Sequence, residues 1–158
     1  MVSRRSTLIN LLITELKKIN GQWDDRPTSL VGPYLFKSNV FDNVYDRWKF
    51  HSDINDYPTI LFTIGQELIT HISSNVRYGS FLVQIRGYVK DEDSLSAADD
   101  LLEDIEFVIE NIREASGFID NQFVDARIVN LSTDNGLLQK QYGIGITDMT
   151  VDFSYQKV

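Results

Sequence analysis

The chain has 158 residues, of which 42% are hydrophobic, carries a formal net charge of −8, and contains no cysteine. This size and apolar content favour one domain, 1–158, with its own core, and the missing cysteines exclude disulfides, thiolate zinc sites and cysteine nucleophiles. The acidic balance disfavours tight DNA binding, which needs a clustered basic face. No apolar segment reaches the length of a membrane span, so we expect no membrane association.

The charge is divided unevenly along the chain. Residues 1–90 carry 11 Lys/Arg and 8 Asp/Glu, a net +3, whereas residues 91–158 carry 4 and 15, a net −11. The acidic excess serves solubility on one interpretation. On the other, opposite-signed faces let copies of the chain pair head-to-tail. The sequence leaves both interpretations open.

The first predicted element is a helix over residues 4–19. Its apolar stripe steps at helical spacing through Leu8, Leu12, Leu16 and Ile19. We expect this stripe to face the core. Gly21 stands where a left-handed residue would end the helix.

Residues 21–57 show no sustained period and form a predicted irregular arm. It contains both tryptophans and two short apolar runs, 34–36 and 40–41, which suggest a small hairpin around residues 38–39. A long aromatic segment without regular structure is often functional. Two interpretations remain open, an arm that packs on another subunit and a loop that covers its own core.

The next elements are predicted strands. Residues 58–64 place Ile60, Phe62 and Ile64 on one face of a strand. Gly65 and Gln66 suggest a turn, and residues 68–72 suggest a hairpin partner. Residues 81–89 form a further strand whose odd positions are apolar. Gly87 within it indicates a bulge or a close approach.

A strongly patterned acidic helix is predicted over residues 95–112, and Gly117 is expected to end it. Ala98, Leu102, Ile105, Ile109 and Ile112 form its stripe, which Leu95, Leu101 and Val108 widen. Ser96 and Asp99 fit a capping box. Four carboxylates, at Asp99, Asp100, Glu103 and Asp104, are expected to form a solvated face. No histidine is near them and their spacing matches no calcium loop, so we predict no metal site.

Two strands end the chain, over residues 124–131 and 146–155, and a long glycine-containing loop over about 133–145 joins them. We expect Gly143 to Gly145 to be a turn that leads into the last strand. The order of elements predicts an α+β fold, a mainly antiparallel mixed sheet with two principal helices packed on one face.

No pattern in the sequence predicts a reaction. His51 and His71 are the two imidazoles, and no nucleophile elbow or phosphate loop accompanies them. We therefore expect no catalytic residue, no cofactor and no metal. The alternative from another class is a small hydrolase that uses Asp148 or Asp152 with His71.

Four segments together resemble a known family. They are residues 57–62 (Tyr-Pro-Thr-Ile-Leu-Phe), 86–89 (Arg-Gly-Tyr-Val), 98–105 (Ala-Asp-Asp-Leu-Leu-Glu-Asp-Ile) and 142–145 (Tyr-Gly-Ile-Gly). The chain resembles, over roughly residues 57–155, the tail terminator (tail completion) proteins of long-tailed bacteriophages. The resemblance implies a mixed sheet flanked by helices, and six copies in a ring at the head-proximal end of the tail tube.

The resemblance also implies a function and a set of partners. Such a ring stops tube polymerisation and presents the docking surface for the head connector or neck protein. The chain would then be hexameric on the tube, and DNA would pass through the lumen without specific binding. The uneven charge further suggests that the ring forms only on the tube and that the isolated chain can be a monomer. Its location would be the virion tail, after assembly in the host cytoplasm. Another head–tail neck or adaptor protein is the alternative within the same class.

We expect ring or tube contacts from the 34–50 arm, the 91–93 turn and the 133–145 loop. Arm and loop are expected to become ordered on assembly, because both carry apolar side chains on irregular backbone. The candidate contact residues are Tyr34, Phe36, Phe41, Trp48, Asp91, Glu92, Asp93, Leu137, Leu138 and Tyr142.

Overall fold

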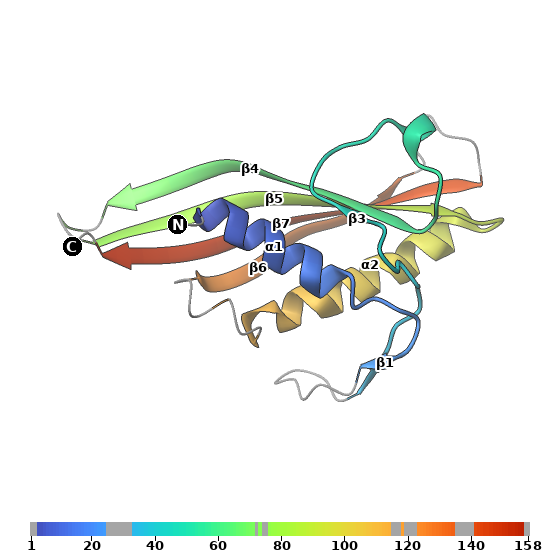
Figure 1. Cartoon of the computed structure of the whole chain (residues 1–158), viewed down its shortest axis with the longest axis horizontal. Coiled ribbons are helices and arrows are strands. Elements are labelled where there is room, and N and C mark those ends of the chain that lie inside the picture. The colour runs from blue at the N-terminus through green and yellow to red at the C-terminus, as the bar shows by residue number, and fades with distance from the viewer. Residues whose placement is uncertain are drawn as a thin grey trace.

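The structure is a computed structural model, which describes residues 3–24, 33–71, 73, 76–114, 118, 123–134 and 141–156 (Figure 1). It contains two α-helices, a five-stranded mixed sheet and a two-stranded sheet, which confirms the α+β prediction. The elements are α1 (Arg4–Leu16), β1 (Trp23–Asp24), β2 (Tyr34–Leu35), β3 (Val44–Tyr45), the 3₁₀ turn η1 (His51–Asp53), β4 (Thr59–His71), β5 (Val76–Lys90), α2 (Ser94–Asn111), the 3₁₀ turn η2 (Ile112–Glu114), β6 (Phe123–Asp134) and β7 (Tyr142–Gln156).

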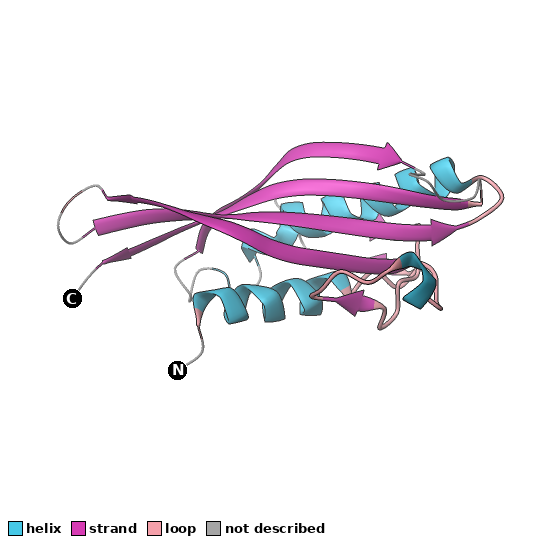
Figure 2. Ribbon diagram, turned by 90° about the horizontal axis from the view of Figure 1, so that it is seen from above, coloured by secondary structure: helices cyan, strands magenta, loops and turns pink. Residues whose placement is uncertain are grey.

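The main sheet has the strand order β3-β4-β5-β7-β6. Its four long strands are antiparallel, and only the short β3 runs parallel to its neighbour β4. Both α-helices lie on one face of this sheet, as Figures 1 and 2 show from two directions. The predicted arrangement of a mainly antiparallel mixed sheet with two helices on one face is confirmed.

The core lies between the helices and the sheet because each strand alternates its side chains. Odd residues of β5 and β7 face the helices, and Phe81, Ile85 and Val151 are at most 1% exposed. From the helices, Leu8, Leu12, Ile105 and Ile109 are each 0% exposed, as the helical spacing predicts. Burying one such aliphatic side chain contributes about 1.5–3 kcal/mol, so this layer provides most of the stability.

Helix α1 is shorter than the periodicity predicts. Ser3 caps its first turn by accepting a hydrogen bond from Ser6 N at 3.0 Å. The helix ends at Leu16, because Lys18 and Ile19 donate to carbonyls three residues back and tighten the chain. That turn still places Ile19 in the core at 0% exposure. Gly21 adopts the expected left-handed conformation, with φ of 73°, but it follows this turn rather than the helix.

Helix α2 begins one residue earlier than predicted and has a different cap. The Asp93 carboxylate accepts a hydrogen bond from Ser96 N at 3.2 Å, so the predicted capping box of Ser96 with Asp99 is wrong. Leu95 is 51% exposed and does not widen the apolar stripe, because it lies in the first turn, away from the sheet. The helix ends at Asn111 and the turn η2 follows it, so the expected end at Gly117 is wrong; Gly117 itself lies outside the described residues.

Strand β4 replaces the predicted hairpin of 58–64 with 68–72. The chain continues through Gly65 and Gln66 as a β-bulge, since Ile64 pairs with Val83 and Glu67 with Phe81, three residues against two. The side chain of Arg5 stabilises the bulge by donating to Ile64 O at 2.7 Å and Gly65 O at 3.1 Å. The partner of β4 is therefore β5, and the expected turn at residues 65–66 is wrong.

Three glycines let α2 approach the sheet closely. A Cβ on Gly87 would lie 2.5 Å from Leu101 Cδ2, which confirms the predicted close approach. On Gly143 it would lie 2.6 Å from Ser94 O, and on Gly145 it would lie 2.8 Å from Leu102 Cγ. The last two glycines are part of β7, so the predicted turn there is wrong. The connection between β6 and β7 shortens to 135–141.

Candidate interaction surfaces

The inner side of the arm packs on α2. Tyr34 stacks on Phe107 with ring centroids 4.2 Å apart, and Phe36 meets the same ring edge-on at 5.6 Å. Phe36 is 3% exposed and belongs to the core. In this fold little of the Phe36 ring is available to a partner, although it remains a predicted contact residue.

Asp104, on the same helix α2 as Phe107, fixes this packing. Its buried carboxylate accepts hydrogen bonds from Tyr34 Oη at 3.0 Å, Lys37 N at 3.0 Å and Ser38 N at 2.7 Å. The expectation of a solvated acidic face is therefore wrong at Asp104, although Asp99 and Glu103 are exposed. The arm covers Asp104 because its backbone N–H groups need an acceptor there.

The electrostatics of this contact follow from burial. Burial raises the pKa of Asp104 by disfavouring the charged form, while the hydrogen bonds from Lys37, Ser38 and Tyr34 oppose that effect. Burial and the neighbouring Asp104 charge also raise the pKa of Tyr34. Lys37 extends the contact by forming an ion pair with Glu103 at the surface.

The predicted hairpin around residues 38–39 is wrong, because the arm pairs with the segment that follows α1. In the two-stranded sheet, Trp23 pairs with Leu35 and Asp24 with Tyr34. Further along, Asn39 bridges to Asn20, and Val40 N donates to Ile19 O at 3.0 Å. The first part of the arm thus covers the chain's own core.

The outer side of the arm exposes large aromatic side chains. We call Phe41, Trp48 and Phe50 the outer aromatic surface; they are 69%, 40% and 81% exposed. Phe41 has a φ of 54°, a left-handed conformation that costs a bulky residue about 1–3 kcal/mol. Bonds from Asn43 N to Val40 O at 3.1 Å and from Val44 N to Asp42 O at 2.9 Å hold that turn. The Phe41 ring is thus exposed on a strained turn and contributes little to the core.

One cation–π contact attaches Trp48 to the second face of the sheet. The guanidinium of Arg86, in β5, lies over the Trp48 ring at 4.5 Å. Within the arm, Lys49 Nζ lies over the Tyr45 ring at 3.5 Å. Beside them, Ile54 packs on Leu61 and Tyr88 in a small second cluster. The arm therefore covers one end of the second face and leaves the rest uncovered.

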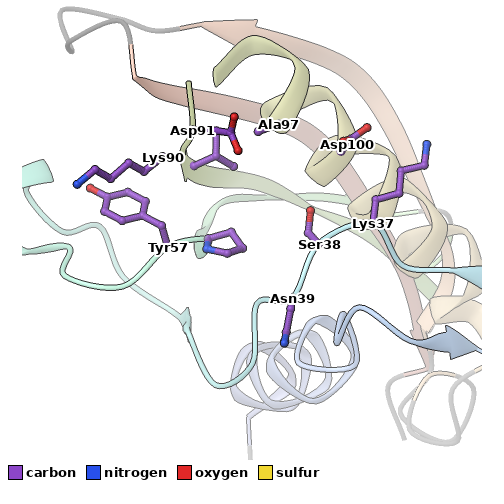
Figure 3. Close-up of a pocket in the computed structure, with 10 residues that line it drawn as sticks. Lys37, Ser38, Asn39, Tyr57, Lys90, Asp91, Ala97 and Asp100 are labelled. Atoms are coloured by element: carbon purple, nitrogen blue, oxygen red, sulfur yellow. The ribbon is translucent and has the colours of Figure 1, made fainter. Parts of the chain in front are cut away.

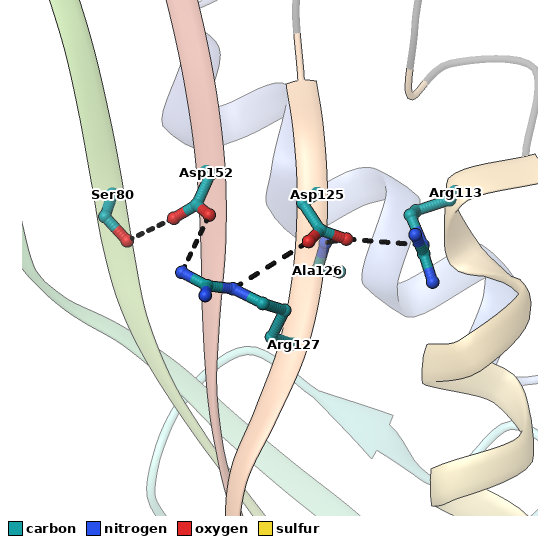
Figure 4. A network of polar contacts seen from close by, with 6 residues as sticks. All are labelled: Ser80, Arg113, Asp125, Ala126, Arg127 and Asp152. Carbon is teal, nitrogen blue, oxygen red and sulfur yellow. Dashed lines mark hydrogen bonds and ion pairs between the residues drawn. The ribbon is translucent and has the colours of Figure 1, made fainter.

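The uncovered part of this face carries a polar network (Figure 4). Asp152 accepts from Ser80 Oγ at 2.8 Å and pairs with Arg127 at 3.0 Å. Asp125 lies between Arg127 at 3.8 Å and Arg113 at 3.3 Å. Each carboxylate of the network has a cationic partner, so this face is polar without a concentrated free charge.

A groove of about 390 Å³ lies beside this network. Three of its side chains are half-exposed apolar groups, with Leu68 at 48%, Tyr78 at 44% and Val124 at 52%. The remaining lining residues are Thr70, Gly79, Ser80 and Asp152.

The predicted acidic turn lies at the end of the molecule where β5 leads into α2. Residues 91–93 are all exposed, and Asp91 N donates to Gln141 O at 2.8 Å. Tyr142 lies next to this bond and its ring is 5.6 Å from that of Tyr57. The structure thus brings the 91–93 turn and Tyr142 together. Leu137 and Leu138 lie outside the described residues.

A polar groove of about 270 Å³ adjoins that turn (Figure 3). Its charged lining residues are Lys37 and Asp100 on one side and Lys90 and Asp91 on the other. Opposite charges alternate around it, which suits contact with another polar surface better than capture of one ion.

The structure disfavours the alternative of a hydrolase. His71 pairs with Arg77 and shares the face of Phe81, whereas Asp148 and Asp152 point to the other face of the sheet with Gln84 and Ser80. Among the described residues, no three His, Cys, Asp or Glu side chains gather where they could hold a metal ion. No helix in the described part of the chain is long and apolar enough to span a membrane.

Sequence reasoning missed two features of these surfaces. Phe50 is the most exposed aromatic residue, at 81%, and the signal for it was the run of aromatic and charged residues from 46 to 50. Asp104 gave no signal, because its carboxylate lies in the same acidic pattern as its exposed neighbours.

Comparison with known proteins gives one family. A protein-family model described as Bacteriophage Tail Tube Terminator Protein matches residues 18–158. No curated protein matches the chain.

Proposed function

The chain belongs to the family of bacteriophage tail tube terminator proteins, and from this we propose that it forms a ring that caps the head-proximal end of the tail tube. The family is one of structural phage tail proteins. The chain is a component of the virion tail and associates with the tail tube.

The match over residues 18–158 is the observation that carries the proposal. It includes the arm and every strand of the sheet, so it spans every surface described above, and it begins after α1, which ends at Leu16. A terminator must recognise the end of the tube, stop further subunits from adding, and leave a channel. We propose that six copies do this as a homo-hexameric ring that also provides the docking surface for the head connector.

The outer aromatic surface is the best candidate for contact with the tube. Aromatic side chains dominate the binding energy of protein interfaces, and Phe41 and Phe50 are exposed far beyond what the fold requires. Arg86 orients the Trp48 ring, so this part of the surface is arranged before binding. We propose that Phe41, Trp48 and Phe50 contact the last ring of tube subunits.

The remaining predicted contacts belong to the ring or to the connector side. Tyr34 and Phe36 support the arm from inside, whereas residues 91–93 and Tyr142 lie together at one end of the molecule. We propose that Asp91, Glu92, Asp93 and Tyr142 contact a neighbouring subunit or the connector, and we extend this to Leu137 and Leu138. On this proposal DNA passes through the ring without specific binding, and assembly takes place in the host cytoplasm.

Tube assembly tests this function. Polymerising tube protein is mixed with increasing amounts of the chain, and tube lengths are measured by electron microscopy. We expect growth to stop and density to appear at one end of each tube. Tubes that grow unaffected would contradict termination. If the chain left tubes unaffected but bound the purified connector, the alternative of a neck or adaptor protein would replace it.

A further inference from the structure

The main sheet has two outer edges (Figure 2). β6 forms one edge along its whole length. β4 forms the other edge beyond residues 60 and 61, where the short β3 pairs with it. Within the described part of the chain, no strand pairs with the outer side of β6 or with β4 after its bulge.

The free stretch of β4 lacks the usual protection of an edge strand. Residues 65–71 are all exposed, and they include Leu68 at 48% and Ile69 at 47% exposure. Edge strands are normally kept from pairing by lysine, proline or a covering segment. This stretch contains neither lysine nor proline, and Glu67 is its one acidic or basic residue apart from His71.

The edge formed by β6 is equally apolar. Val124 is 52% exposed, Val129 63% and Leu131 39%. The strand contains no lysine or proline, and two bulges interrupt its pairing with β7, between Phe123 and Asp125 and between Ile128 and Asn130. Such bulges twist an edge and shorten its regular stretches, which weakens pairing between free copies.

We propose that the β6 edge of one copy pairs with the free β4 edge of the next copy, an inference that rests on the ring described above. Because β4, β5, β7 and β6 alternate in direction, a neighbour's β4 in the same orientation lies antiparallel to β6. This placement keeps the helices of every copy on the same face. The two edges differ, so the contact is heterologous and repeats until the ring closes.

The composition of the two edges is compatible with a second copy as the occupant. The free stretch of β4 carries one charged side chain, Glu67, and β6 carries Asp125, Arg127 and Asp134, so neither edge concentrates like charge that would repel the other. One copy presents both edges, and each offers the unpaired backbone donors and acceptors that the other needs.

The arrangement also accounts for assembly at the tube and for the channel. The short regular stretches of β6 make one contact weak, but copies held on a tube end meet at high effective concentration. In a closed ring the helix layer takes the wider outer circumference. The face with Ser80, Gln84 and the Asp152 network then lines the channel, where its paired carboxylates offer no phosphate site.

Cysteine cross-linking tests the pairing, because the chain contains no cysteine of its own. Val124→Cys is combined in turn with Gln66→Cys, Leu68→Cys and Thr70→Cys, since strands in a closed sheet are staggered. Capped tubes are treated with an oxidant or a short bismaleimide linker. We expect at least one pair to give a ladder of covalent multimers that ends at the ring. The single variants and the pair Val124→Cys with Leu95→Cys should give none.

The outcomes separate this inference from the proposed function. Capped tubes without a ladder for any pair would overturn the edge pairing and leave termination intact. If the wild-type chain caps no tubes, the double-cysteine variants are cross-linked as concentrated free protein. The absence of a ladder in that experiment also overturns the pairing. Independently, Val129→Lys should leave the melting temperature unchanged and weaken capping by roughly tenfold or more. The control variant Leu95→Lys should leave both the melting temperature and capping unchanged. Unchanged capping by Val129→Lys would count against the pairing.

Discussion

The layer between α2 and the sheet differs from the arm in what its sequence encodes. Residues of that layer recur with the period of a helix or a strand and are buried wherever the period places them inside, as with Ile105 and Val83. The arm has no period. It is fixed by single contacts such as Asp104 with Ser38 N, and it exposes Phe41 and Phe50. Periodic residues are buried in the core here, whereas the exposed aromatic residues of the arm are the ones that we propose for binding.

The largest expected effect is in the periodic layer. Ile109→Asp places an unpaired charge at a site that is 0% exposed, so we expect a loss of about 4 kcal/mol or more and an unfolded chain. Leu95→Asp makes the same change at a site that is 51% exposed and should cost little. Thermal melting of both variants checks this. Similar melting temperatures would mean that the burial of α2 is misassigned.

The contact between Asp104 and the arm should rank second. Asp104→Ala removes the acceptor of three hydrogen bonds and leaves partly buried donors unpaired, so we expect a loss of about 1–3 kcal/mol. Asp99→Ala changes an exposed carboxylate and should be nearly neutral. Urea unfolding measures both. An equal, small effect would show that the arm does not depend on Asp104.

A substitution at Phe41 should raise the free energy of unfolding, whereas the two changes above lower it. Phe41→Gly removes the left-handed strain and exposes no core, so the free energy of unfolding should rise by up to about 1 kcal/mol. Phe50→Gly removes a comparably exposed ring and should not stabilise the chain, because the described backbone has its one non-glycine left-handed residue at Phe41. Both variants should cap tubes poorly. A destabilised Phe41→Gly variant would mean that the ring contributes to folding.

The smallest effect is the pH dependence of the Asp104 contact. Because burial raises the pKa of Asp104 above its ordinary value of 3.8, the folded chain holds this proton at higher pH than the unfolded chain. Its contribution to stability is then present at low pH and falls as the pH rises through the raised pKa. Asp104→Asn lacks this titration. Unfolding free energies of both proteins from about pH 3 to about pH 8 should diverge in that window; parallel curves would contradict the assigned direction.

The sequence predicted most of the periodic layer because burial there follows from local spacing alone. Both helices, the burial of odd residues in β5 and the close approach at Gly87 were derivable from it. The failures share another cause. The bulge at residues 65–66, the strand assignment of Gly143 and the burial of Asp104 each depend on what packs against the residue from a distant segment. The sequence does not distinguish a glycine in a turn from one packed against a helix, or a buried carboxylate from an exposed one.

The exposure of the arm was predictable in part for the same reason. An aromatic arm without a period predicted a contact region, which stays a prediction, and Phe41 and Trp48 are exposed. Its inner side, at Tyr34 and Phe36, was indistinguishable in sequence from its outer side, because partner residues such as Phe107 lie some seventy positions away. The free edges of β4 and β6 became visible only when the strand order was known.

The division between a folding layer and a binding arm is tested most directly by one variant of the outer aromatic surface. Phe41→Ser, Trp48→Ser and Phe50→Ser are combined in one chain, and its tube capping and melting temperature are measured beside the wild type. We expect melting close to that of the wild type and tubes that continue to grow. A variant that melts normally and still stops tube growth at wild-type concentrations would contradict the assignment of this surface to the tube.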